Sequence, residues 1–365
     1  MGKKWQVNFG ADKTEELIIS TKRNTVYHPP VVFQGVDIKR VQTHRHLGLI
    51  ISNDLSWDAH IDHIIHKANK RLGLMSRLKW QIDRRSLEII YKSFILPSLE
   101  YGNVILDSAS ARQLKRLETI QYRSAIAVTC ALRTSSYSKL CEELGWNTLA
   151  ERRQLQQMKL IFKIRSGKTP TSLNRILHSP APHRHQHFVR GANNLHSFKS
   201  KTTRFSNSFF PKSVRTWNKL PGDIKSPDTL QKFNSKLRHR FKPKKHIHFA
   251  VGEKRANAML TRLRVGMSAL KSHLFTRGLS DTPECDCHLG PETPLHFLIV
   301  CPAHINPRRN LLAAVRDLIP KFHRYSSKKQ CNILLRGCDL LNTNQNTRIM
   351  KQVQNFIRLS KRFDA

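Results

Sequence analysis

Three cysteines and one histidine in the last quarter of the sequence have the composition of a metal site. Their spacing is Cys285-x-Cys287-x8-His296-x4-Cys301. Three thiolates and one imidazole fill the tetrahedral coordination of zinc and leave no open position, so we predict a structural zinc ion and no catalytic metal. A single residue separates Cys285 from Cys287, whereas about two to four residues usually separate such a pair. Alternative fourth ligands are His288 and His304.

The residues around this cluster suit a compact metal-binding turn. Asp286 and Gly290 favour a tight turn after the first cysteine, and Leu295 to Val300 favours a short helix that presents His296 and ends before Pro302. The alternative interpretation is three buried free thiols beside an unrelated histidine. The remaining cysteines are expected to be small core residues: Cys130, Cys141, Cys331 and Cys338.

The charge of the chain is strongly positive and unevenly distributed. The 64 Lys and Arg residues outnumber 25 acidic residues, for a formal net charge of +39. Residues 151–280 alone contain 29 basic and 4 acidic residues. Such a field favours a polyphosphate partner, because neutralising phosphates releases counterions and offsets self-repulsion. We therefore expect RNA or DNA as the partner, bound with little sequence preference, and no small-molecule substrate.

The basic middle segment provides the candidate nucleic-acid contacts. It interleaves Lys and Arg with aromatic residues, a composition typical of nucleic-acid-binding grooves. Phe209, Phe210 and Trp217 have apolar neighbours, so we expect these rings to be mostly core. The candidate contact residues are Arg204, Lys212, Arg215, Arg238, Arg240, Lys242, Lys244, Lys245, Arg262 and Arg264.

Membrane association and secretion are not expected. The sequence has no apolar run near the roughly 18 residues of a spanning helix and no lipidation signal. Met1 to Trp5 opens without the apolar region of a signal peptide. Scattered, odd-numbered cysteines favour a reducing compartment. These features predict an intracellular protein, nuclear or cytoplasmic.

Periodicity predicts a helical chain with a short strand-rich start. Thr14 to Thr21, Val31 to Phe33 and His46 to Ser52 have strand composition. Helical periodicity begins near Asp58. The predicted helices run from about Asp58, from Arg84 to near Pro97, from Ser110 to Ala127, on either side of Gly145 as far as Gly167, and over Lys212–Lys219, Asp228–Phe241, Glu253–Phe275, Asn306–Leu318 and Thr343–Phe363.

An ordered series of short motifs resembles one family. It comprises Trp5 to Glu15 (WQVNFGADKTE), His46 to Ile51, Leu55-Ser56-Trp57, Ile90-Tyr91, Ile95-Leu96-Pro97, Tyr101-Gly102, Leu144-Gly145-Trp146, Phe209-Phe210-Pro211, Trp217-Asn218 and Leu260 to Arg264. In this order they resemble the region after the palm in reverse transcriptases of non-LTR (LINE-type) retrotransposons. The resemblance covers most of the chain.

The resemblance implies an architecture. We expect a mainly α fold: a small β-rich N-terminal stub (1–55), a helical thumb-like bundle (56–167), a basic linker (168–208), a basic helical nucleic-acid-binding region (209–280) and a zinc-knuckle-like module with C-terminal helices (281–365).

The resemblance also bears on activity. The family polymerises through paired palm aspartates that hold two metal ions, and no Asp-Asp pair occurs in this sequence. The family's palm would lie upstream of Trp5, and the family's endonuclease domain is not expected in this sequence. We therefore expect a nucleic-acid-binding fragment without enzyme activity. Two alternatives stay open: a host RNA- or DNA-binding adaptor derived from such an element, and a decayed element with no function.

Overall fold

The computed structural model describes residues 10–20, 27–178, 194–243 and 246–364. Its chain divides into two compact units, each assembled from separate stretches of sequence. Unit 1 comprises residues 1–70, 98–118 and 152–237, and unit 2 comprises 71–97, 119–151 and 238–365. Helices α2, α6, α8 and α13 therefore contribute residues to both units.

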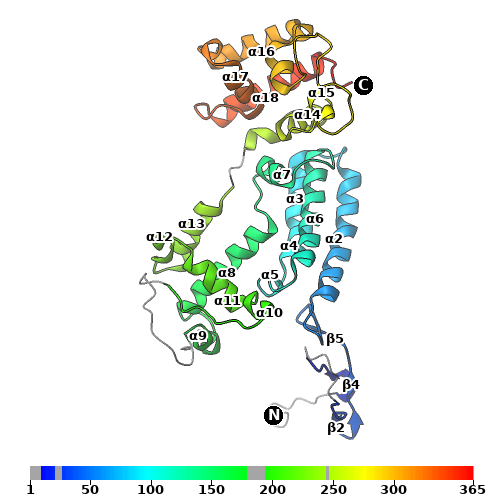
Figure 1. Ribbon diagram of the computed structural model, residues 1–365, viewed down its shortest axis with the longest axis vertical. Helices are drawn as coiled ribbons and strands as arrows, with labels where there is room; N and C mark the ends of the chain where they lie inside the picture. The colour runs from blue at the N-terminus through cyan, green and yellow to red at the C-terminus, as the bar shows by residue number, and fades with distance from the viewer. Residues whose placement is uncertain (1–9, 21–26, 179–193, 244–245, 365) are drawn as a thin grey trace. The chain divides into compact units, whose positions relative to one another are not determined.

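The N-terminal part of unit 1 contains small two-stranded sheets (Figure 1). β1 (Glu15–Glu16) pairs in parallel with β4 (Lys39–Arg40), β2 (Val32–Phe33) pairs antiparallel with β3 (Val36–Asp37), and β5 (Thr43–His46) pairs antiparallel with β6 (Leu49–Ser52). Only Ile38 and Ser52 are buried among the described residues up to 52. The expected β-rich N-terminal stub is confirmed, with strands shorter than predicted.

The β5–β6 hairpin shows how local sequence determines this region. Leu47 and Gly48 both have positive φ, 44° and 82°. This is the backbone of a type I′ turn, whose twist matches that of the paired strands. The turn sets the register His46 opposite Leu49.

Helices dominate the next part of the chain. They are α2 (Asp58–Leu78), α3 (Arg84–Ile90), the π-helix η2 (Tyr91–Ile95), α4 (Leu96–Glu100), α5 (Asn103–Leu106), α6 (Ala111–Thr129), α7 (Tyr137–Leu144) and α8 (Leu149–Arg165). The apolar stripe predicted on α2 is buried at Ile61, Ile64, Ala68, Leu72 and Met75. Burial of that stripe is what makes this long helix part of the core.

The helix predicted from Arg84 to near Pro97 ends slightly later than expected. The helical path continues through Pro97 to Glu100. The π-helical turn before Pro97 shifts the backbone hydrogen bonds by one residue, so that the Leu96 N–H donates to the Tyr91 carbonyl. This widened turn accommodates the residue that lacks an N–H. Gly102, in the left-handed conformation at φ 65°, ends the segment.

The described residues of the basic middle segment include several short helices. It contains α9 (Thr171–His178), α10 (Thr203–Ser206), α11 (Phe209–Asn218), α12 (Gly222–Lys225) and α13 (Leu230–Phe241). Of these, α9 and α10 lie inside the stretch 168–208 that we expected to be a linker. Trp217 is fully buried, as predicted, whereas Phe209 and Phe210 are half-buried. Trp217 stacks on the buried Phe233, with ring centroids 5.6 Å apart.

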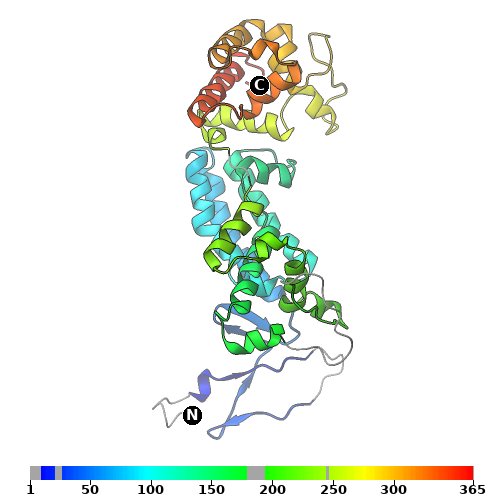
Figure 2. The same ribbon diagram turned by 90° about the vertical axis from the view of Figure 1, so that its left-hand side faces the viewer.

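The C-terminal part of unit 2 is a helical module (Figure 1 and Figure 2). It has its own apolar core. Its α-helices are α14 (Lys254–Val265), α15 (Lys271–Phe275), α16 (Ile305–Leu318), α17 (Ser327–Arg336) and α18 (Thr343–Leu359). Between them lie the 3-10 helices η3 (Ile247–Ala250), η5 (Pro302–His304) and η6 (Phe322–Arg324) and the π-helix η4 (His296–Val300). In both views α18, in red, lies beside α16, in orange.

One helix prediction in this module is corrected, and one helix was missed. The single helix expected over Glu253–Phe275 is broken, because Gly266 adopts the left-handed conformation at φ 77° and closes the end of α14. Helix α17 was not predicted. Among the described residues, no helix combines the length and apolar character needed to cross a bilayer.

Candidate metal centre and nucleic-acid interface

The four predicted metal ligands come together in unit 2. The ligand atoms of Cys285, Cys287, His296 and Cys301 all lie within 4.8 Å of one another. The Cys285 and Cys301 Sγ atoms are 3.7 Å apart, and His296 Nε2 lies 3.1 Å from Cys287 Sγ. Three thiols and one imidazole nitrogen converging in this way can hold a metal ion.

The first pair of ligands sits on a tight turn. The Cys285 N–H donates to the Gly290 carbonyl at 3.0 Å, and the His288 N–H donates to the Cys285 carbonyl at 2.9 Å. His288 and Gly290 have positive φ, 60° and 120°. This turn lets ligands separated by a single residue point toward the same centre. The gap that looked too short in the sequence is therefore compatible with a common site.

The second pair of ligands is positioned by a π-helical turn, η4. The Thr293 side chain accepts the His296 N–H at 3.1 Å at the start of the turn. At its end the Cys301 N–H donates to the His296 carbonyl at 2.8 Å. The wider helical turn thus brings His296 and Cys301 to the same side. The short helix predicted to present His296 and to stop before Pro302 is confirmed.

The alternative histidines are placed elsewhere. The His304 ring packs edge-on against Phe297, with centroids 5.1 Å apart. Neither His304 nor His288 joins the group of converging ligand atoms. His296 Nε2, which faces the Cys287 thiol, is thus the nitrogen placed for metal binding.

Burial opposes deprotonation of two of the three thiols, those of Cys285 and Cys301. Cys285 is 7% and Cys301 1% exposed. Burial raises the pKa of Cys285 to about 12 and raises the pKa of Cys301 above its usual value. Thiolates are the ligands of zinc, so a metal ion must displace protons from these groups as it binds.

A buried ion pair ties this site to the C-terminal end of the chain. Glu292, 3% exposed, accepts from Arg362 Nε at 2.5 Å and from Arg362 Nη2 at 2.7 Å. The same carboxylate accepts the Lys271 N–H at 2.6 Å, at the start of α15. Sequence reasoning missed both residues, because their pairing spans 70 positions.

Of the predicted nucleic-acid contacts in unit 1, two are exposed and one is paired. Arg204 and Arg215 are exposed and donate to backbone carbonyls, of Asp54 at 3.0 Å and of Ser206 at 2.7 Å. Lys212 Nζ lies 2.6 Å from the buried Asp107 carboxylate. Lys212 therefore has a structural partner already.

Other predicted contacts cluster at the end of α13. Arg238, Arg240 and Lys242 are all exposed there. Lys244 and Lys245 lie outside the described residues. Closely spaced cations at a helix C-terminus are favoured by the helix dipole and are accessible to a phosphate backbone.

The two predicted contacts on α14 are used inside the protein. Arg262 is half-buried and donates to the Cys130 carbonyl at 3.1 Å through Nε and at 3.0 Å through Nη2. Arg264 is only 7% exposed and is paired with Glu143. The expectation that Arg264 contacts nucleic acid is therefore corrected, because its guanidinium is not accessible to a phosphate.

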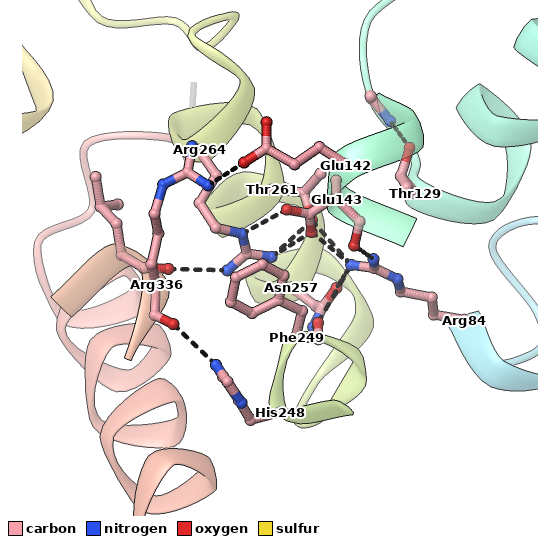
Figure 3. A network of polar contacts seen from close by, with 12 residues as sticks. Arg84, Thr129, Glu142, Glu143, His248, Phe249, Asn257, Thr261, Arg264 and Arg336 are labelled. Carbon is pink, nitrogen blue, oxygen red and sulfur yellow. Dashed lines mark hydrogen bonds and ion pairs between the residues drawn. The ribbon is translucent and has the colours of Figure 1, made fainter. Parts of the chain in front are cut away.

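Arg264 belongs to a buried polar network centred on Glu143 (Figure 3). Arg264 donates to the two Glu143 carboxylate oxygens at 2.6 and 2.8 Å, and Arg84 Nη1 donates to one of them at 2.8 Å. The Phe249 ring packs 4.0 Å from the Arg264 guanidinium. Two buried arginines thus share one carboxylate and connect α3, α7 and α14 within unit 2.

Comparison with known proteins finds low but extended similarity to retrotransposon proteins. The chain is 23% identical over 317 residues to a Pol polyprotein from the type-1 retrotransposable element R1 of Bradysia coprophila, covering 83% of this chain and 28% of that protein. It is 22% identical over 292 residues to a Pol polyprotein from element R1 4 of Nasonia vitripennis, covering 77% and 66%.

A shorter region resembles a third protein. Over 132 residues the chain is 24% identical to a probable RNA-directed DNA polymerase from transposon X-element of Drosophila melanogaster, covering 35% of this chain and 14% of that protein. The chain thus spans at most 66% of the length of these three relatives. No family model and no solved structure matches the chain. The family resemblance seen in the sequence motifs is confirmed, and the chain is a homologue of the RNA-directed DNA polymerases of non-LTR retrotransposons.

Proposed function

We propose that this chain is a nucleic-acid-binding region of a retrotransposon reverse transcriptase, which grips RNA or DNA through the phosphate backbone. The observation that carries the proposal is the excess of positive charge, 29 basic against 4 acidic residues over 151–280, in a homologue of RNA-directed DNA polymerases. Backbone contacts carry no sequence information by themselves. Binding is therefore expected to be largely independent of sequence.

The accessible cations are the side chains proposed to make these contacts. Arg204 and Arg215 in unit 1, and Arg238, Arg240 and Lys242 in unit 2, are exposed. Trp217 and Phe233 are buried, so these two rings are not offered to bases. Phosphate neutralisation, rather than base stacking on these aromatic residues, is the contribution that this arrangement supports.

The Cys/His cluster is proposed to hold one structural zinc ion. Its donors, Cys285, Cys287, His296 and Cys301, match the ligand softness and tetrahedral geometry of zinc and leave no position for substrate. Bound zinc would hold the turn and η4 together. This role belongs to folding, not to chemistry on a nucleic acid.

The chain is proposed not to polymerise on its own. Two-metal nucleotidyl transfer needs carboxylates placed to hold a pair of metal ions, and this sequence has no Asp-Asp pair. The adjacent acids of unit 2, Glu142 and Glu143, are used in ion pairs with arginines.

Salt-dependent binding tests the nucleic-acid proposal. Fluorescence anisotropy with labelled RNA and DNA should give a log–log salt slope near about −5, the value expected when about six phosphates are neutralised. The double variant Arg238→Ala/Arg240→Ala should reduce the magnitude of the slope by about two, since each cation contributes about one.

A control with the same charge change separates a defined interface from bulk attraction. Lys321 and Lys328 are exposed residues in the C-terminal module of the same unit, outside the segment 151–280. Lys321→Ala/Lys328→Ala should leave the slope close to that of the wild type. Equal loss in both double variants, equal binding to an acidic polypeptide of matched charge, or a flat salt dependence would contradict the proposal.

A further inference from the structure

The C-terminal end of η4 is capped by a buried arginine. Arg308, on α16, donates from Nε to the Leu298 carbonyl at 3.0 Å. Its Nη2 donates to the carbonyls of Phe297 at 3.2 Å and Cys301 at 2.5 Å. One guanidinium thus binds three carbonyl groups of the segment that links two of the predicted metal ligands.

The charge of Arg308 is as notable as its hydrogen bonds. Arg308 is 6% exposed, and within the described part of the chain no carboxylate pairs with it. Burying a cation is costly unless an opposite charge lies nearby. The carbonyl dipoles that it binds offset only part of this cost.

The metal centre supplies the missing charge. A divalent zinc ion bound by three thiolates and one neutral imidazole carries a single net negative charge. Lys271 and Arg362, the other cations bound near the site, each have a carboxylate partner, in Asp286 and Glu292. Arg308 is therefore the cation near the site that can balance the negative charge of the zinc-loaded centre.

We propose that Arg308 is a positioning residue and counter-charge of the metal centre. Its fork holds carbonyls within η4 and at the residue that follows it, which sets the backbone of Cys301 relative to His296. Its charge stabilises the metal-loaded state more than the metal-free state. This inference rests on the proposed metal centre, whose occupant it does not change.

Metal titration of the full chain tests the inference. Co²⁺ is the optical probe and a chelating indicator measures Zn²⁺ affinity. Arg308→Gln should weaken binding of both ions by about 10–100-fold, the usual loss when a partner behind a metal ligand is removed. The adjacent Arg309 is exposed and provides the control. Arg309→Gln should bind as the wild type does.

Two further measurements distinguish a counter-charge from a merely structural contact. The gain in melting temperature on zinc loading should be smaller in Arg308→Gln than in wild type. The loss of a purely structural contact would instead lower the melting temperatures of the metal-free and zinc-loaded forms equally and leave the gain unchanged. Arg308→Lys retains the charge but not the forked guanidinium, so its gain in melting temperature should lie between those of the wild type and Arg308→Gln. It replaces Arg308→Gln in the test if that variant does not fold.

The outcomes separate the two proposals. A wild-type chain that binds neither ion would refute the metal centre itself. Loss of binding in Cys301→Ser together with wild-type affinity and an unchanged melting-temperature gain in Arg308→Gln and Arg308→Lys would overturn only the role of Arg308. The same weakening in Arg309→Gln would also overturn it.

Discussion

Replacement of Glu143 by glutamine is the sharpest test of how unit 2 is held together. The Glu143 side chain is 3% exposed and lies between the side chains of Arg84, 8% exposed, and Arg264, 1% exposed. Glu143→Gln preserves the shape of the side chain but leaves two buried cations without a counter-charge. Breaking one buried ion pair costs about 3–5 kcal/mol. Because two arginines lose their partner, we expect a loss at the upper end of that range.

The neighbouring residue supplies a control. Glu142 pairs with Arg336 at 2.8 Å, but its side chain is 59% exposed. Solvent screens such a pair, so Glu142→Gln should cost at most about 1 kcal/mol. Both substitutions remove one negative charge at adjacent positions of α7, and they differ chiefly in burial.

The order of effects within the network is a second readout. Arg264→Met removes one cation and leaves Glu143 paired with Arg84, so the remaining pair is neutral. Arg264→Met should therefore destabilise the protein less than Glu143→Gln does. A model in which the network acts only through its number of hydrogen bonds predicts the opposite order, since Arg264 makes several of them.

Native-state hydrogen exchange is the suitable assay, because a chain with two units need not unfold in one step. Amides of α14 and α7 should lose protection in Glu143→Gln, and urea unfolding should begin at lower denaturant. Equal free energies of opening in Glu143→Gln and Glu142→Gln would refute the reasoning, since burial would then make no difference.

Acid provides an independent check with a defined sign. Burial alone would raise the pKa of Glu143, but the charges of Arg264 and Arg84 outweigh it and hold the pKa below its usual value. A carboxyl with a lower pKa in the folded state contributes stability that is fully present above its unfolded pKa and is lost as the pH falls through the folded pKa. Acid unfolding of the wild type should therefore contain a component that is absent in Glu143→Gln.

Further predictions concern the metal and the polymerase reaction. Purified wild-type chain should contain one zinc ion, and both Cys301→Ser and His296→Ala should lose it, as measured by elemental analysis; full retention in His296→Ala would point instead to His288 or His304 as the fourth ligand. Chelation should loosen residues 280–305 while leaving the amides of α2 and α6 protected from exchange. No primer extension should occur on RNA or DNA templates with Mg²⁺ or Mn²⁺, and metal-dependent incorporation that survives stringent purification would contradict this.

Local sequence determined much of the helical architecture. The apolar spacing on α2, from Ile61 to Met75, predicted both the helix and the face that is buried. Gly145, which closes α7 in the left-handed conformation, was recognisable as a boundary because few other residues adopt that backbone. The potential donors of the candidate metal site could also be identified from the sequence, since they lie within 17 consecutive residues.

Other features depend on partners far away in the chain. The run Leu260 to Arg264 looks like a helix with basic residues in solvent, yet Arg264 is buried because Glu143, 121 positions earlier, lies opposite it. The π-helical turn before Pro97 likewise had no local signal. A sequence motif cannot reveal such burial, because the free energy of a charged side chain depends on which opposite charge meets it.

The same reason explains why Arg308 was missed beside a site that was found. Candidate metal ligands can be recognised by residue type, since cysteine and histidine are the residues that bind zinc through a thiolate or an imidazole nitrogen. Arg308 is one of 64 basic residues and differs from Arg309 only in the direction that α16 gives it. Composition determined that this chain is a polycation with the residues of a candidate metal site. Only the tertiary structure decided which cations face solvent and which are held inside, because burial follows from packing and not from residue type.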